Sequence, residues 1–91
     1  MTTIANSSAR EHVQSCSPFK GSNIFGDTLT NGIYAVWSYG THWPLFATVG
    51  YHWYENEGRY SVTTNKHRSQ CHPHAETIKV SCDELRRIIE A

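Results

Sequence analysis

The side chains of this chain that could do chemistry are mainly its six histidines. His42 and His67 both fall where predicted strands end. Two imidazoles that converge on a phosphodiester can cleave it without a metal, one as general base and the other as general acid. His42 and His67 are therefore the candidate catalytic pair, although their spacing does not show that the two side chains converge.

A second candidate is a metal site made of His67, Cys71 and His74. Zinc takes three or four nitrogen and sulfur ligands in tetrahedral geometry. The chain has no Cys-x2-Cys pair, and Pro73 stiffens the turn between His72 and His74. We therefore expect surface imidazoles and one packed thiol here, with no metal and no cofactor.

The main candidate for binding is the polar string Thr-Thr-Asn-Lys-His-Arg-Ser-Gln at residues 63–70. Its first oxygen atoms can cap a short helix expected over residues 66–70, whose N-terminus would favour anions. No acidic residue lies between Glu57 and Glu76, so the stretch is positively charged. It is either an ordinary capped turn or a contact surface for phosphate, nucleic acid or an acidic protein. The expected contact residues are Arg59, Tyr60, Thr63, Thr64, Lys66, His67, Arg68 and Gln70, together with His42.

Charge and cysteine content narrow the class of protein. Eight basic and eight acidic side chains give a formal net charge of zero. This balance lacks both the basic footprint of a typical nucleic-acid-binding domain and the strong negative charge of a DNA mimic. The first residues lack the basic and apolar regions of a signal peptide, so we expect none, and no apolar run approaches the ~20 residues that span a bilayer. Three widely spaced cysteines predict reduced thiols and a cytoplasmic protein.

The elements that must position these residues fall into two parts. Residues 1–23 are poor in large apolar side chains, which predicts a flexible or weakly structured N-terminal arm. Residues 24–91 predict a single α+β domain. Its short β-branched and aromatic runs are separated by glycine and asparagine turns, and this tight spacing requires antiparallel neighbours. Strands are expected over residues 33–39, 45–49, 51–54, 60–64 and 76–80.

The C-terminal segment has the clearest helix pattern. Ser81 and Glu84 form a capping box, and Leu85, Ile88 and Ile89 follow at helical spacing. The predicted fold is therefore a small antiparallel sheet of three to five strands with a C-terminal amphipathic helix packed on it. Because so small a domain buries only about 60% of its unfolded surface, a homodimer is among the expected arrangements.

Three strings in this chain resemble small proteins encoded by bacteriophages and prophages. They are Ser-Tyr-Gly-Thr-His-Trp-Pro at residues 38–44, Trp-Tyr-Glu-Asn at 53–56 and Tyr-Ser-Val-Thr-Thr-Asn-Lys-His-Arg-Ser-Gln at 60–70. The family pattern reads S-Y-G-T-H-[FW]-P, then W-x-x-N, then Y-S-x-T-T-x-x-H-x-S-Q. The resemblance implies a phage accessory protein rather than a particular chemistry. Such proteins commonly bind and disable host machinery, including defence systems such as CRISPR–Cas.

We therefore expect a non-enzymatic, phage-derived binding protein that inhibits host machinery by occlusion in the host cytoplasm. An anti-CRISPR-like inhibitor is the most concrete version. The expected partner is a host protein or ribonucleoprotein complex, with nucleic acid as a further candidate and no membrane. The alternative is a small nucleic-acid-binding protein or a metal-independent nuclease that uses His42 and His67. The binding hypothesis requires that the polar string faces outward.

Overall fold

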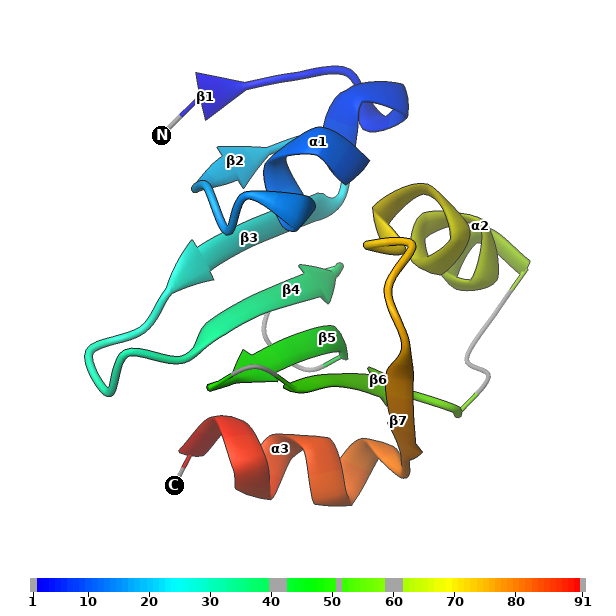
Figure 1. Cartoon of the computed structure of the whole chain (residues 1–91). Coiled ribbons are helices and arrows are strands. Elements are labelled where there is room, and N and C mark those ends of the chain that lie inside the picture. The colour runs from blue at the N-terminus through cyan, green and yellow to red at the C-terminus, as the bar shows by residue number, and fades with distance from the viewer. Residues whose placement is uncertain (1, 40–42, 51, 59–61, 91) are drawn as a thin grey trace.

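The computed structural model describes residues 2–39, 43–50, 52–58 and 62–90 (Figure 1). Within these ranges the backbone forms one seven-stranded sheet with helices on both faces. The strands are β1 (Thr2–Thr3), β2 (Phe19–Lys20), β3 (Ile24–Thr28), β4 (Tyr34–Ser38), β5 (Pro44–Val49), β6 (His52–Asn56) and β7 (Thr77–Val80). The helices are the short 3-10 helix η1 (Asn6–Ser8), α1 (Ala9–Gln14), α2 (Val62–Cys71) and α3 (Cys82–Glu90).

The strands lie in the sheet in the order in which they occur in the chain. Neighbours from β2 to β6 are antiparallel, whereas β1–β2 and β6–β7 are parallel. The α+β class with a C-terminal helix on the sheet is confirmed, but the sheet is mixed and has more strands than predicted. The parallel pair β6–β7 exists because α2 lies in the connection between them, and parallel strands need such a crossover.

Strand β4 is the interior strand that its composition predicts, since all five of its residues are buried. Tyr34 and Val36 pack in the apolar cluster under α1 and α2. Ala35 and Trp37 point to the opposite face and pack in the cluster under α3. Because side chains alternate along β4, the strand contributes residues to two apolar cores, one on each face of the sheet.

The N-terminal residues are part of the packed domain rather than a separate arm. Ala9, Val13 and Phe19 are fully buried in the cluster on the α2 face. The Arg10 guanidinium donates hydrogen bonds of 2.8 Å to two carbonyl groups at and just beyond the end of α2. These contacts attach α1 to α2, and Figure 1 shows the two helices on the same side of the sheet. The sequence does not predict this packing, because Ala9 is small and α1 is too short for a clear apolar stripe.

Helix α3 begins as its capping box predicts. The Ser81 hydroxyl accepts the Glu84 N–H at 3.2 Å. Leu85 and Ile89 are buried, and the helix lies across β5 and β6. None of the helices among the described residues is long and apolar enough to cross a membrane.

Helix α2 is longer than predicted. It begins at Val62, so residues 62–64, expected to end a strand, are helical instead. Residues 60 and 61 of that expected strand lie outside the described residues. Threonine is enriched in strands, but this preference depends on context, and tertiary structure can override it. Here the context is the crossover between β6 and β7, which places the polar string on a helix that packs against the sheet.

Candidate functional site

His67, a candidate for both binding and catalysis, lies inside the fold. Its side chain is only 5% exposed, and Nδ1 lies 2.8 Å from the Ser38 hydroxyl oxygen at the end of β4. Burial lowers the pKa of His67, and the Lys66 ammonium lowers this pKa further. His67 therefore joins α2 to β4 as a neutral imidazole. His42, its expected catalytic partner, lies outside the described residues.

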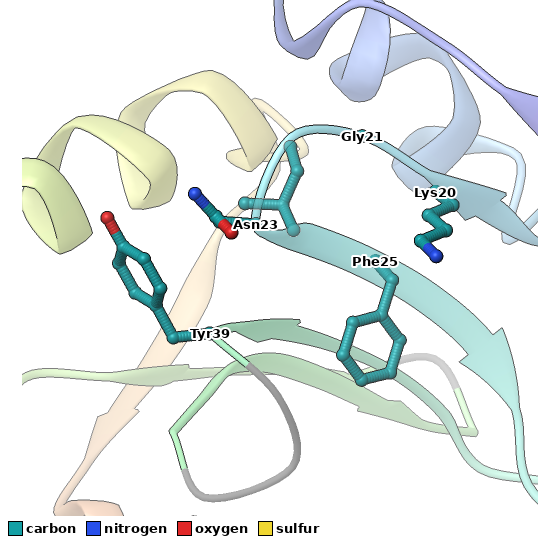
Figure 2. A pocket seen from close by; sticks show the side chains of 6 residues that line it. Lys20, Gly21, Asn23, Phe25 and Tyr39 are labelled. Carbon is teal, nitrogen blue, oxygen red and sulfur yellow. The ribbon is translucent and has the colours of Figure 1, made fainter.

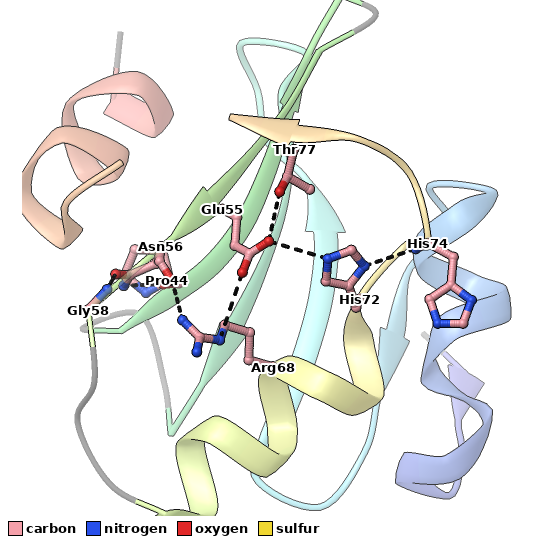
Figure 3. Close-up of polar contacts among 8 residues, drawn as sticks. All are labelled: Pro44, Glu55, Asn56, Gly58, Arg68, His72, His74 and Thr77. Carbon is pink, nitrogen blue, oxygen red and sulfur yellow. Dashed lines mark hydrogen bonds and ion pairs between the residues drawn. The ribbon is translucent and has the colours of Figure 1, made fainter. Parts of the chain in front are cut away.

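A buried carboxylate on β6 contacts three polar side chains, one from α2, one from the turn after it and one from β7 (Figure 3). Glu55 is 7% exposed, and its Oε1 accepts a hydrogen bond of 2.7 Å from the Thr77 hydroxyl. The same oxygen lies 3.3 Å from Nε2 of His72, while Oε2 lies 3.9 Å from Nε of Arg68. This network draws the C-terminal end of α2 onto β6 and β7.

Arg68, one of the predicted contact residues, is turned inward and mostly buried. Besides its ion pair with Glu55, its Nη1 donates a 2.8 Å hydrogen bond to the carbonyl of Asn56. The Asn56 side chain is itself buried: its Nδ2 donates to the Pro44 carbonyl and its Oδ1 accepts the Gly58 N–H, each at 2.8 Å. Arg68 therefore completes a structural network at the end of β6.

His72 forms a Glu–His pair with Glu55, the composition of a catalytic dyad. However, its Nδ1 accepts the backbone N–H of His74 at 3.0 Å. This contact assigns the ring proton to Nε2, which faces Glu55 at 3.3 Å (Figure 3). Because both nitrogens are engaged within the fold, His72 is arranged to hold the turn after α2 rather than to accept a proton from a substrate.

The alternative metal set of His67, Cys71 and His74 is not assembled. Cys71 is fully buried, and burial raises the pKa of its thiol to about 12. A metal ligand must be a thiolate, which such a site disfavours at neutral pH. His67 is bonded to Ser38, and His74 is exposed beyond the end of α2. Across the described ranges, no three His, Cys, Asp or Glu side chains are grouped to hold an ion.

Of the predicted contact residues, the one that the structure places clearly outward is Lys66, which is exposed. Gln70 is half-buried, and its Oε1 is buried without a hydrogen-bond partner among the described residues. Thr63 and Thr64 belong to the first turn of α2, but their side chains lie outside the described part. Arg59 and Tyr60 lie outside it as well.

An exposed aromatic residue outside the predicted contact set is Tyr39, directly after β4. Its φ is 58°, and its side chain is 47% exposed. Its backbone N–H donates a 2.9 Å hydrogen bond to the carbonyl of Asn23, whose φ is 60°. Its ring lies 5.5 Å from the ring of His67. A bulky side chain at positive φ is strained, so the fold holds this tyrosine in place against a backbone cost.

Tyr39 forms one wall of a hollow on the surface (Figure 2). The hollow has a volume of about 340 Å³ and is lined by Lys20, Gly21, Asn23, Ile24, Phe25 and Tyr39. The Phe25 ring is fixed because it stacks on Trp37 with ring centres 4.9 Å apart. The Lys20 side chain is exposed and supplies a positive charge on the other side of the hollow.

The exposed Lys20 lies across the hollow from Tyr39, and the exposed Lys66 lies close enough to His67, the ring neighbour of Tyr39, to lower the pKa of His67. We call Lys20, Asn23, Phe25, Tyr39 and Lys66 the Tyr39 surface. Comparison of the chain with protein-family models, with curated proteins and with solved structures finds no match. The function is therefore argued from this geometry.

Proposed function

We propose that this chain is a non-enzymatic binding protein that inhibits host machinery by covering the surface of a host protein. The phage origin is the one that its three motif strings suggest, and an anti-CRISPR-like inhibitor is its most concrete version. The observation that carries the proposal is Tyr39, a half-exposed aromatic side chain held at a strained φ of 58°.

Strain of this kind supports a binding role. A non-glycine residue at positive φ costs about 1–3 kcal/mol and is concentrated at functional sites. Here the strained residue has an exposed ring, so packing of the ring in the core does not explain why the strained backbone is kept. Tyrosine is also enriched among the residues that dominate the energy of protein interfaces. Tyr39 is therefore assigned the role of anchor.

The charges around the anchor define the chemistry of the partner. Lys20 lies across the hollow from Tyr39, and Lys66 is next to His67, whose ring contacts Tyr39; both lysines are exposed. Exposed ammonium groups near an exposed aromatic ring favour an acidic protein surface, since complementary charge speeds association and fixes orientation. The mechanism is then steric: Tyr39 enters a pocket of the partner, and the body of the sheet blocks access to the surface around it.

The environments of His67 and His72 also support a role without catalysis. His67 is buried against Ser38, and both nitrogens of His72 are engaged by Glu55 and the His74 backbone. Proton transfer to or from a substrate would require one of these contacts to break. The competing nuclease hypothesis depends on His42 together with His67.

Capture from bacterial lysate on the immobilised chain tests the proposal. Lys66→Ala and Arg87→Ala form a matched pair, because each removes one exposed cation from a helix, on α2 and α3 respectively. The wild type and Arg87→Ala should recover the same stoichiometric protein. Lys66→Ala should bind it about fivefold more weakly, the effect of losing one interfacial charge pair. Equal binding by the two variants would show that the captured protein does not bind the Tyr39 surface.

A second assay separates the two classes of function. The purified chain is incubated with labelled RNA and DNA, with and without a chelator. The binding proposal expects intact nucleic acid in every sample. Cleavage by the wild type that disappears in His67→Asn would instead establish the nuclease alternative.

A further inference from the structure

Strand β7 lies at one edge of the sheet and pairs with β6. An edge strand offers a row of backbone N–H and C=O groups to another strand. Ile78, one of its two inner residues, is 46% exposed. It is one of three large apolar side chains with high exposure among the described residues, with Tyr39 and Val49. The edge thus has two features of an interface. Its backbone groups can pair with another strand, and the apolar Ile78 side chain beside them is exposed.

The hydrogen bonding of β7 shows which backbone groups point away from β6. The Glu57 N–H donates to the Val80 carbonyl at 2.9 Å, so Val80 turns its backbone groups toward β6. Because this direction alternates along a strand, Ile78 also turns its backbone groups toward β6. Thr77 and Lys79 therefore direct their N–H and C=O groups outward, ready to pair with a further strand.

We propose that β7 pairs antiparallel with β7 of a second copy of this chain, about a two-fold axis that passes beside Ile78. Residues that oppose each other in antiparallel strands point to the same face of the sheet. A two-fold axis that runs between the two β7 strands, perpendicular to the sheet, therefore places one residue opposite the same residue of the second copy. With Ile78 on the axis, Thr77 opposes Lys79 of the second copy, and all the outward backbone groups of β7 are paired. A register centred on Lys79 would instead oppose two ammonium groups.

Several features make a second copy the fitting occupant of this edge. The Ile78 side chains of the two copies meet at the axis, on the same face as Val80, which belongs to the apolar cluster under α3. The pairing would thus extend this cluster across the interface. The formal net charge of zero leaves no long-range repulsion between copies.

The edge is also rigid before pairing. The Thr77 hydroxyl is bonded to the buried Glu55 at 2.7 Å, which holds β7 in place. A preformed edge lowers the entropy cost of association. Four residues make a small interface, however, and interfaces below about 1,200 Å² belong to weak, reversible complexes. The dimer is therefore expected to form in a concentration-dependent way.

Analytical ultracentrifugation over a concentration series tests this interface. Lys79→Pro removes an N–H that faces outward and leaves the pairing with β6 intact, since proline is tolerated at such edge positions. Lys79→Ala is its matched control, because it removes the same side chain and keeps the N–H. Wild type and Lys79→Ala should dimerise with similar constants, whereas Lys79→Pro should dimerise at least tenfold more weakly.

A second pair of variants tests the axis itself and does not depend on proline. Ile78→Glu places two carboxylates against each other at the axis, whereas Val49→Glu adds the same charge at a residue of similar exposure, 38%, on β5. Ile78→Glu should be monomeric and Val49→Glu should dimerise like the wild type. A monomeric wild type would overturn the proposal, and so would a dimer that both Lys79→Pro and Ile78→Glu leave unchanged. Circular dichroism checks that each variant is folded.

Discussion

Tyr39 combines backbone strain with exposure, and the two properties can be separated by substitution. Tyr39→Ala and Tyr39→Gly both remove the ring, but glycine adopts a φ of 58° without the clash of a Cβ atom. The free energy of unfolding of Tyr39→Gly should therefore exceed that of Tyr39→Ala by about 1 kcal/mol. Urea unfolding of the two variants measures this difference. Equal stabilities would mean that the backbone at residue 39 is not strained.

His67 predicts a dependence of stability on pH. Burial lowers its pKa in the folded chain, while the unfolded imidazole titrates near its ordinary value of about 6.5. Its contribution to stability is therefore present above pH ~6.5 and is lost as the pH falls through the folded pKa, because the unfolded state then binds more protons.

The comparison with His67→Asn isolates this contribution, because asparagine keeps a polar side chain beside Ser38 and does not titrate. As the pH falls from about 7 to about 5, the unfolding free energy of the wild type should decrease more steeply than that of His67→Asn. Urea titrations at several pH values measure the two slopes. Parallel slopes would show that His67 does not titrate differently in the folded and unfolded chains.

At the scale of elements, the contact between α2 and the end of β6 depends on Arg68. Arg68→Ala removes a charge-assisted hydrogen bond to the Asn56 carbonyl and leaves the buried Glu55 with one partner fewer. We expect it to lower the free energy of unfolding by about 2–3 kcal/mol. Arg87→Ala, on the exposed face of α3, should change it by at most about 0.5 kcal/mol. Chemical denaturation compares them, and equal effects would mean that Arg68 is not part of the structural network.

Elements with a strong local signal are the ones that the sequence predicts well. The apolar stripe and capping box of α3 and the β-branched and aromatic run of β4 are local patterns, and both elements occur where they are expected. The polar string on α2 is predicted less well, because its polar side chains predict an exposed surface although two of them face the fold. His67 is hydrogen-bonded to Ser38, 29 positions away in the chain. Arg68 is hydrogen-bonded to the carbonyl of Asn56 at the end of β6, 12 positions away. Such pairs depend on the crossover and not on local pattern.

The Tyr39 surface could not be predicted for a related reason. Tyr39 extends the alternating run of β4, so the pattern indicates a strand residue that shares a face with Trp37. In the fold, however, Tyr39 has a positive φ, its N–H is bonded to the carbonyl of Asn23 before β3, and its ring contacts His67 from α2. The hollow beside it likewise combines β2 and β3 with the end of β4. Neighbours in the sheet, rather than in the chain, create this site.

At the scale of the whole molecule, the N-terminal residues should be needed for folding. Ala9, Val13 and Phe19 are fully buried, and Phe19→Ala alone should cost about 3–5 kcal/mol, close to the whole stability of a small domain. A chain that begins at residue 24 should therefore lose cooperative unfolding. Thermal melts followed by circular dichroism test this, and a sharp transition in the shortened chain would support an independent domain of residues 24–91.

The two proposed surfaces lie on different parts of the sheet. The Tyr39 surface combines residues of β2, β3 and α2 with the residues before β3 and after β4, whereas the dimer edge is β7, which β5 and β6 separate from β4. Pairing through β7 would therefore leave both copies of Tyr39 accessible, and a dimer could engage two partner sites at once. Bivalent engagement raises the overall affinity without new contacts. A monomeric Ile78→Glu variant should keep the intrinsic affinity of each site.

The most direct measurement of the binding role is the affinity of Tyr39→Gly for the protein captured by the wild type. This variant removes the anchor while it relieves the backbone at residue 39, so a loss of binding would not reflect a damaged fold. We predict that Tyr39→Gly remains folded in urea titrations and binds at least tenfold more weakly, as expected for an interface anchor worth about 2 kcal/mol. Binding of Tyr39→Gly at the wild-type affinity would contradict the proposed function.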